Sequence, residues 1–197
     1  MTGRVVYFIS HPDVVVSADV PVTQWPLSAT GMGRMRDALA QPWVRTLSAL
    51  YSSTETKAVD AVRILAAHRG LPWTEIPALG EIDRAATGYL PPLEFERVAD
   101  AFFAQPESSV RGWERAVDAQ RRITDAVAAI VRDDASPGAI GIVSHGAVGA
   151  LLYCALTGAP IDRRFDQPHR GGGCYLAFPV SSPGTCAWWR AVDEGAE

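Results

Sequence analysis

Two histidines in this chain each follow a run of apolar residues. The run "VVYFIS" leads into His11-Pro12-Asp13, and the run "AIGIVS" leads into His145-Gly146. A neutral imidazole can act as a nucleophile, as a general base or as a hydrogen-bond donor to a developing negative charge. The same pattern, a predicted strand that ends in Ser-His, occurs twice at positions far apart in the sequence. This repetition indicates that the two histidines belong to a functional site.

The elements around these histidines alternate between strand and helix patterns. Strands are predicted over 4–10, 46–53 and 139–145, a short one over 72–77, and two near the C-terminus over 174–180 and 186–192. Helices are predicted after Ser28, after Thr54, over 93–104, over 113–134 and over 146–158. Apolar strands that alternate with helices predict an α/β fold with a mainly parallel sheet.

This architecture predicts where the histidines meet. In open α/β sheets, ligands bind beyond the carboxyl ends of the strands. His11, Ser52-Ser53 and His145 all stand at that end of three separate predicted strands. We therefore expect two imidazoles and a hydroxyl cluster to face one crevice.

The composition narrows the function classes. The 197 residues predict a single domain over 1–197, and a net charge of −4 argues against a general nucleic-acid binder. The three cysteines form no CxxC pair, which fits a reducing cytoplasm. The sequence shows no signal peptide and no run long enough to span a membrane, so we expect a cytoplasmic protein with no membrane partner.

Five segments follow one another in order along the chain: Ser10-His11-Pro12, Leu27-Ser28-Ala29-Thr30-Gly31, "YSSTETKAVDA" with Lys57-Ala58, Leu79-Gly80-Glu81 and Ser144-His145-Gly146. Together they resemble the histidine phosphatase superfamily of phosphoglycerate-mutase-like proteins. The resemblance covers nearly the whole chain. It implies a three-layer α/β/α sandwich of the phosphoglycerate-mutase type.

The resemblance also implies a catalytic cycle. His11 would attack phosphorus and form a phosphohistidine, and Glu81 would be the acid and base, with Asp83 as the fallback. His145 would be catalytic by binding the phosphoryl oxygens. The other phosphate-binding positions would be Ser10, Lys57 and Gly146. No metal and no cofactor is needed for this chemistry.

Three positions depart from the superfamily pattern. Ser10 stands where the family has an arginine beside the nucleophile, Lys57 replaces a second arginine, and Pro12 replaces a glycine. A hydroxyl carries no charge, and a lysine lacks the bidentate fork of a guanidinium. We therefore expect a less cationic pocket, with Ser10→Arg strengthening phosphate binding. The candidates to compensate are Arg84, Arg170 and Arg63.

The function expected is a metal-independent phosphatase for a phosphomonoester, with a small phosphorylated molecule or a phosphoprotein as substrate. The alternative is a catalytically degenerate member that binds a phosphorylated ligand or protein partner. A homodimer is kept as a candidate assembly.

Two other site types fit less well. A serine hydrolase elbow around Ser144 would need a glycine where Ile142 stands, and a metal site of His11, His145 and Asp13 lacks HxxxH or HExxH spacing.

Overall fold

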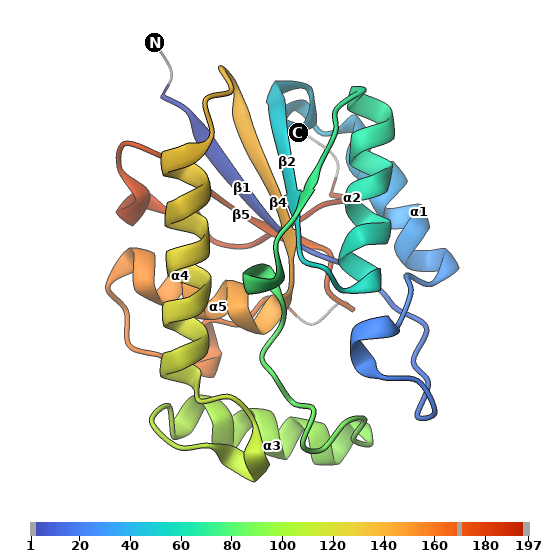
Figure 1. The fold of residues 1–197 in the computed structure, drawn as a ribbon, viewed down its shortest axis with the longest axis vertical. Coiled ribbons are helices and arrows are strands. Elements are labelled where there is room, and N and C mark those ends of the chain that lie inside the picture. The colour runs from blue at the N-terminus through green and yellow to red at the C-terminus, as the bar shows by residue number, and fades with distance from the viewer. Residues whose placement is uncertain (1–2, 169–170, 195–197) are drawn as a thin grey trace.

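A twisted sheet forms the centre of the molecule (Figure 1). The computed structural model describes residues 3–168 and 171–194, and within them the sheet has six strands in the order β3-β2-β4-β1-β5-β6. β1, β2, β3 and β4 pair in parallel, and β5 and β6 pair antiparallel. The predicted, mainly parallel sheet is confirmed. The strands are β1 (Val5–Ser10), β2 (Leu47–Ser52), β3 (Thr74–Glu75), β4 (Ala139–Ser144), β5 (Cys174–Pro179) and β6 (Arg190–Ala191).

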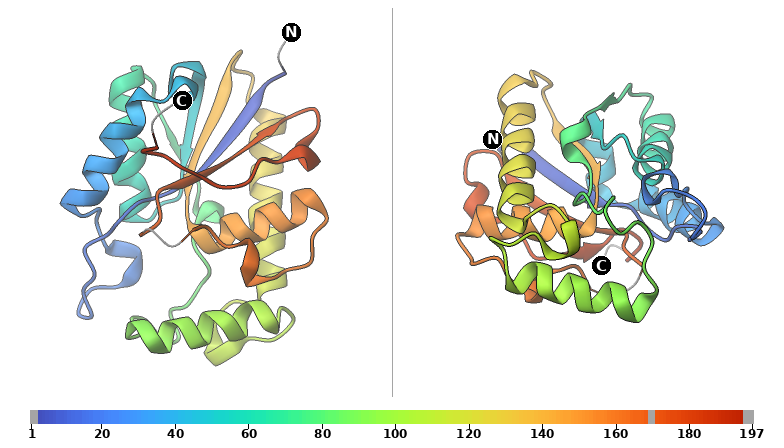
Figure 2. Two further views of the ribbon diagram at one scale, coloured as in Figure 1. Left: turned by 180° about the vertical axis from the view of Figure 1, so that it is seen from behind. Right: turned by 60° about the horizontal axis from the view of Figure 1, so that its bottom comes forward.

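Helices cover both faces of this sheet (Figures 1 and 2). One layer holds α1 (Ala29–Asp37) and α2 (Thr56–Arg69), and the opposite layer holds α4 (Ala116–Asp133) and α5 (Gly146–Thr157). α3 (Pro92–Ala104) lies beyond the carboxyl ends of the central strands (Figure 1). No helix in the described ranges is both long and apolar enough to cross a membrane.

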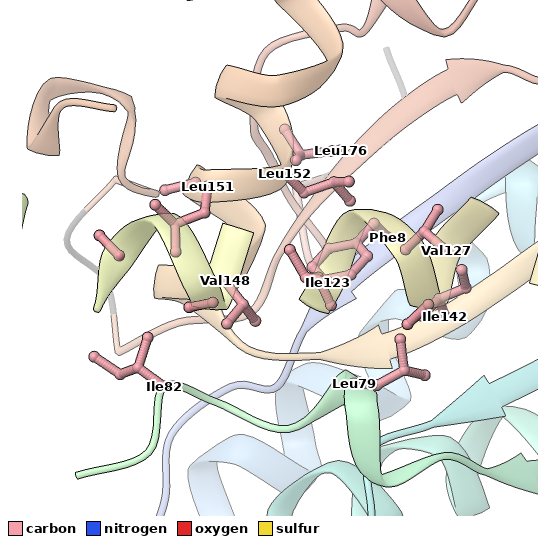
Figure 3. Packing of buried hydrophobic residues seen from close by; sticks show 14 of the residues in the cluster. Phe8, Leu79, Ile82, Ile123, Val127, Ile142, Val148, Leu151, Leu152 and Leu176 are labelled. Carbon is pink, nitrogen blue, oxygen red and sulfur yellow. The ribbon is translucent and has the colours of Figure 1, made fainter. Parts of the chain in front are cut away.

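Successive side chains of a strand point to opposite faces of the sheet, so the strands contribute to a hydrophobic cluster on each face. On β1, Val6 and Phe8 belong to the cluster beneath α4 and α5, and Ile9 belongs to the cluster beneath α1 and α2. Figure 3 shows Phe8 and Ile142 packed among side chains of α4 and α5. β4 is buried at all six positions because it lies between β2 and β1 and is covered on both faces.

Local signals set the helix boundaries. Ser28 caps α1 as expected, because its side chain accepts a hydrogen bond from the Gly31 N–H at 3.0 Å. Gly70 ends α2 with a φ of 64°, a left-handed conformation that glycine adopts without strain. The N-cap of α2 is Glu55, one residue later than the expected Thr54.

The last predicted strand is shorter than expected. The pattern predicts a strand over 186–192, but only Arg190–Ala191 pairs with β5. The preceding turn at Pro183–Thr185 is 3-10 helical, and the Ala187 N–H makes a separate bond to Ala177 O at 2.9 Å. The chain therefore joins the sheet edge in two separate short contacts.

The sheet register brings three carboxyl ends together. Ser10 of β1 lies beside Ser144 of β4, and Ser52 of β2 lies beside Val143. The pairing continues one step further, since the His11 N–H donates to Ser144 O at 3.1 Å and the Ser53 N–H donates to Val143 O at 2.9 Å. The residues after β1, β2 and β4 therefore share one edge of the sheet.

Candidate active site

The two imidazoles meet at this edge. The ring centroids of His11 and His145 lie 5.1 Å apart, with the ring planes at 73°. His11 is half-buried and His145 is fully buried. His11 Nδ1 lies 2.9 Å from Pro12 O. Because a carbonyl oxygen only accepts, the proton sits on Nδ1 and Nε2 keeps its lone pair.

The surroundings keep His11 neutral. Burial lowers its pKa from 6.5 to about 4, and the charge of Lys57 acts in the same direction. The hydrogen bond to Pro12 opposes this shift without reversing it. At neutral pH the ring is therefore uncharged, which is the form a nucleophile requires.

His145 has one nitrogen engaged and one open. Its Nε2 lies 2.9 Å from Ser53 Oγ and 3.4 Å from Glu55 Oε1. Its Nδ1 is buried and has no hydrogen-bond partner in the described part of the chain. Burial, reinforced by the charge of Lys57, lowers the pKa of His145 well below its ordinary value. A buried polar atom without a partner is costly, so Nδ1 marks a position for a ligand atom.

A carboxylate that the sequence analysis did not single out lies inside this site. Glu55 Oε2 is 2.5 Å from Lys57 Nζ, and both residues are more than nine-tenths buried. Lys57 also donates to Val22 O at 2.7 Å. Lys57, expected to bind phosphate, is therefore already paired with an internal anion. The available signal was position, since Glu55 follows a buried strand by three residues.

Glu81 lies at the start of α5. Its carboxylate accepts the N–H groups of Ala147 and Val148, the residues after His145-Gly146, at 3.2 and 3.1 Å. The Glu81 N–H in turn donates to Glu55 Oε1 at 2.8 Å. Burial raises the pKa of Glu81, and the charge of Glu55 raises it further, while its backbone hydrogen bonds lower it. The net shift favours the protonated form that a general acid needs.

The Ser10 hydroxyl, expected to bind phosphate, is engaged by Gln167 and Cys174 in the structure. The residue is fully buried. Its Oγ lies 2.5 Å from Gln167 Oε1 and 3.1 Å from Cys174 O, which share its single O–H, and it accepts the Cys174 N–H at 3.0 Å. Gln167 also lies against Gly146, where an added Cβ would approach its Nε2 to 2.1 Å. Neither contact of Gln167 could be predicted from the sequence, because Gln167 is distant along the chain from both Ser10 and Gly146.

The remaining candidate site residues differ in their exposure and in their partners. Asp83 is exposed, and its carboxylate accepts the Ala85 N–H at 2.9 Å. Arg63 is exposed and pairs with Asp60 at 3.2 Å. Arg84 is half-buried, with its guanidinium carbon 5.0 and 6.0 Å from the ring centroids of two aromatic residues, Phe95 and Trp25. Arg170 lies outside the described residues.

The alternative site types gain no support. Ser144 Oγ is buried and donates to Leu79 O at 2.7 Å, so it is not presented as a nucleophile. Asp13 pairs with Arg34 at 2.9 Å. Across residues 3–168 and 171–194, no group of three His, Cys, Asp or Glu side chains could hold a metal ion.

A comparison with known protein families identifies the superfamily of the chain. A family profile described as histidine phosphatase superfamily (branch 1) matches residues 13–177. The chain belongs to this superfamily. The match begins two residues after His11, so the divergent Ser10-His11-Pro12 segment lies outside it. A search of curated protein sequences found no match.

Solved structures of this superfamily share the fold. Bacillus stearothermophilus YhfR is 24% identical, with 98% of each chain covered and a TM-score of 0.77. A mycobacterial glucosyl-3-phosphoglycerate phosphatase in complex with inorganic phosphate is 18% identical, covering 98% of this chain and 100% of that one, with a TM-score of 0.76. The α-ribazole phosphatase of Shigella flexneri is 19% identical, with the same coverage and a TM-score of 0.73. These similarities confirm the phosphoglycerate-mutase-like fold.

Proposed function

We propose that the chain is a phosphatase that hydrolyses a phosphomonoester through a phosphohistidine at His11. One observation carries the proposal: two neutral imidazoles lie 5.1 Å apart at the carboxyl end of a parallel sheet, and the Pro12 carbonyl leaves His11 Nε2 free to attack. The substrate would be a small phosphorylated molecule or a phosphoprotein. Two of the solved relatives, the glucosyl-3-phosphoglycerate phosphatase and the α-ribazole phosphatase, are named as phosphatases, which supports this class.

The first half-reaction transfers the phosphoryl group to His11. The Nε2 lone pair forms the N–P bond while the bond from phosphorus to the ester oxygen breaks. Glu81, whose pKa is raised by burial, gives its proton to the departing oxygen. A phosphoryl oxygen accepts a hydrogen bond from His145 Nδ1, the buried nitrogen that has no partner in the described part of the chain. Donation of the Ser53 hydroxyl proton to Nε2 places the imidazole proton on Nδ1, where it can stabilise the oxyanion.

The second half-reaction returns His11 to its starting state. Ionised Glu81 removes a proton from water, the water oxygen attacks phosphorus, and the N–P bond breaks with its electron pair returning to Nε2. Inorganic phosphate leaves and Glu81 is again protonated. Each proton and bond is accounted for without a metal or a cofactor.

A second candidate follows from Glu55. A buried carboxylate paired with Lys57 opposes the entry of another anion, and Ser10 is engaged with β5. These features favour a degenerate member that binds a phosphorylated ligand or protein partner weakly and does not turn it over.

An aryl phosphate assay separates the two candidates. We expect wild-type turnover that is abolished in His11→Ala and retained in His68→Ala, a matched control on the exposed end of α2. Equal residual rates in wild type and His11→Ala would refute the phosphatase. Measurable phosphate binding in that case would support the binding candidate.

A further inference from the structure

We propose that Arg84 is the cation that binds the phosphoryl group, reaching the site from the loop after Glu81. The inference rests on the proposed function and identifies which residue of the site carries the charge. It follows from the hydrogen bonds that occupy the neighbouring cations Lys57 and Arg122, and from the ring contacts and burial of Arg84.

The other nearby cations are already committed. Lys57, Arg84 and Arg122 each lie close enough to His145 for their charge to lower its pKa. Lys57 is paired with Glu55. Arg122 donates to Glu114 and to three backbone carbonyls. The Arg84 guanidinium makes no hydrogen bond and no ion pair with any residue in 3–168 or 171–194.

Aromatic rings hold Arg84 without using its donors. The guanidinium carbon lies 5.0 Å from the ring centroid of Phe95 and 6.0 Å from that of Trp25. Ring contact of this kind binds the cation through its charge and leaves the N–H groups free. Trp25 is itself fixed, since its Nε1 donates to Ser17 O at 2.9 Å and to Val20 O at 3.0 Å. The side chain is therefore positioned and has open donors.

The burial of Arg84 favours the binding of an anion to its guanidinium. Burial lowers the pKa of Arg84, while the charges of Glu81 and Glu55 act in the opposite direction. These carboxylates act on the cation from the site but are themselves bonded to the α5 backbone and to Lys57. A half-buried guanidinium without a hydrogen-bonded partner gains from a phosphoryl oxygen that accepts its N–H groups. Arg84 would thus replace charge that Ser10 and the paired Lys57 do not supply.

The experiment measures oxyanion binding. Inorganic phosphate and vanadate are titrated calorimetrically into wild type, Arg84→Gln, Arg84→Lys and the control Arg63→Gln, whose side chain is 60% exposed on α2. We expect Kd to rise by about 10- to 100-fold in Arg84→Gln, by less in Arg84→Lys, and not at all in Arg63→Gln. Melting temperatures are recorded for each variant, because a purely structural role would lower them and leave Kd unchanged.

The outcomes distinguish the two proposals. Phosphate binding that is unchanged in Arg84→Gln overturns the role of Arg84 and leaves the phosphatase intact. Loss of binding in Arg84→Gln, together with wild-type protein that binds phosphate but never turns over an aryl phosphate, supports Arg84 and overturns the phosphatase. A wild-type protein that binds neither ion overturns both.

Discussion

Replacing Glu55 with glutamine should free Lys57, the cation with which Glu55 is paired, to bind phosphate. Glu55 is 8% exposed, and its Oε2 lies 2.5 Å from Lys57 Nζ. Glutamine keeps the size of the side chain and the oxygen that accepts the Glu81 N–H. The substitution therefore removes one negative charge and changes little else.

The magnitude follows from the charge that is removed. Two negative charges about 6 Å apart, at an effective dielectric constant of about 20, repel each other by about 2.8 kcal/mol. Removing this repulsion corresponds to roughly 100-fold tighter phosphate binding. Without ligand the change is unfavourable, because an unpaired buried cation costs about 3–5 kcal/mol. Phosphate should then take the place of Glu55 as the counter-ion of Lys57.

The assay is thermal unfolding with and without phosphate, combined with calorimetric titration. Glu55→Gln should melt below wild type in buffer and recover more stability on adding phosphate than wild type does. The control is Glu107→Gln, an exposed carboxylate on the surface, which should behave as wild type in both measurements. Phosphate affinity in Glu55→Gln that equals or falls below that of wild type would refute the assignment of Glu55 as an internal counter-anion.

Four further predictions follow from the same geometry. Since His11 must be neutral and its pKa is about 4, the acidic limb of the kcat/KM profile should lie near pH 4, and a limb near 6.5 would exclude His11 as the titrating nucleophile. The folded chain binds this proton less readily than the unfolded chain, so the free energy of unfolding should decrease as pH falls from about 6.5 towards 4 in chemical denaturation. Glu81→Gln should slow single-turnover phosphorylation by an alkyl phosphate much more than by an aryl phosphate, whose leaving group needs little protonation, and equal slowing would exclude Glu81 as the acid. Ser10 is fully buried against β5, so Ser10→Arg should lower the free energy of unfolding by about 1–3 kcal/mol or more in a denaturant titration and should not strengthen phosphate binding. Tighter phosphate binding at an unchanged free energy of unfolding would contradict this packing.

The sequence predicted the meeting of His11 and His145 because it depends on local patterns. Each histidine ends a buried strand, and parallel strands present their carboxyl ends on one edge. The helix boundaries at Ser28 and Gly70 were predictable for the same reason, since a capping side chain and a left-handed glycine act within a few residues.

The departures come from contacts across the chain. Ser10 is withdrawn from the site by Gln167 and Cys174, and Lys57 is held by Val22 as well as by Glu55. No periodicity signals a hydrogen bond between residues far apart in sequence, and the resemblance to a family describes what aligned positions do elsewhere. The electrostatic character of this pocket therefore became apparent only from the structure.

The most direct test is to look for the phosphohistidine itself. Wild-type protein is mixed with an aryl phosphate, quenched at neutral pH within the first turnover, and examined by intact-mass and peptide mass spectrometry. We expect one phosphoryl group per chain, located on His11, formed together with a burst of the aryl alcohol and absent in His11→Ala. Turnover with no phosphorylated chain, or a phosphoryl group on any other residue, would contradict it.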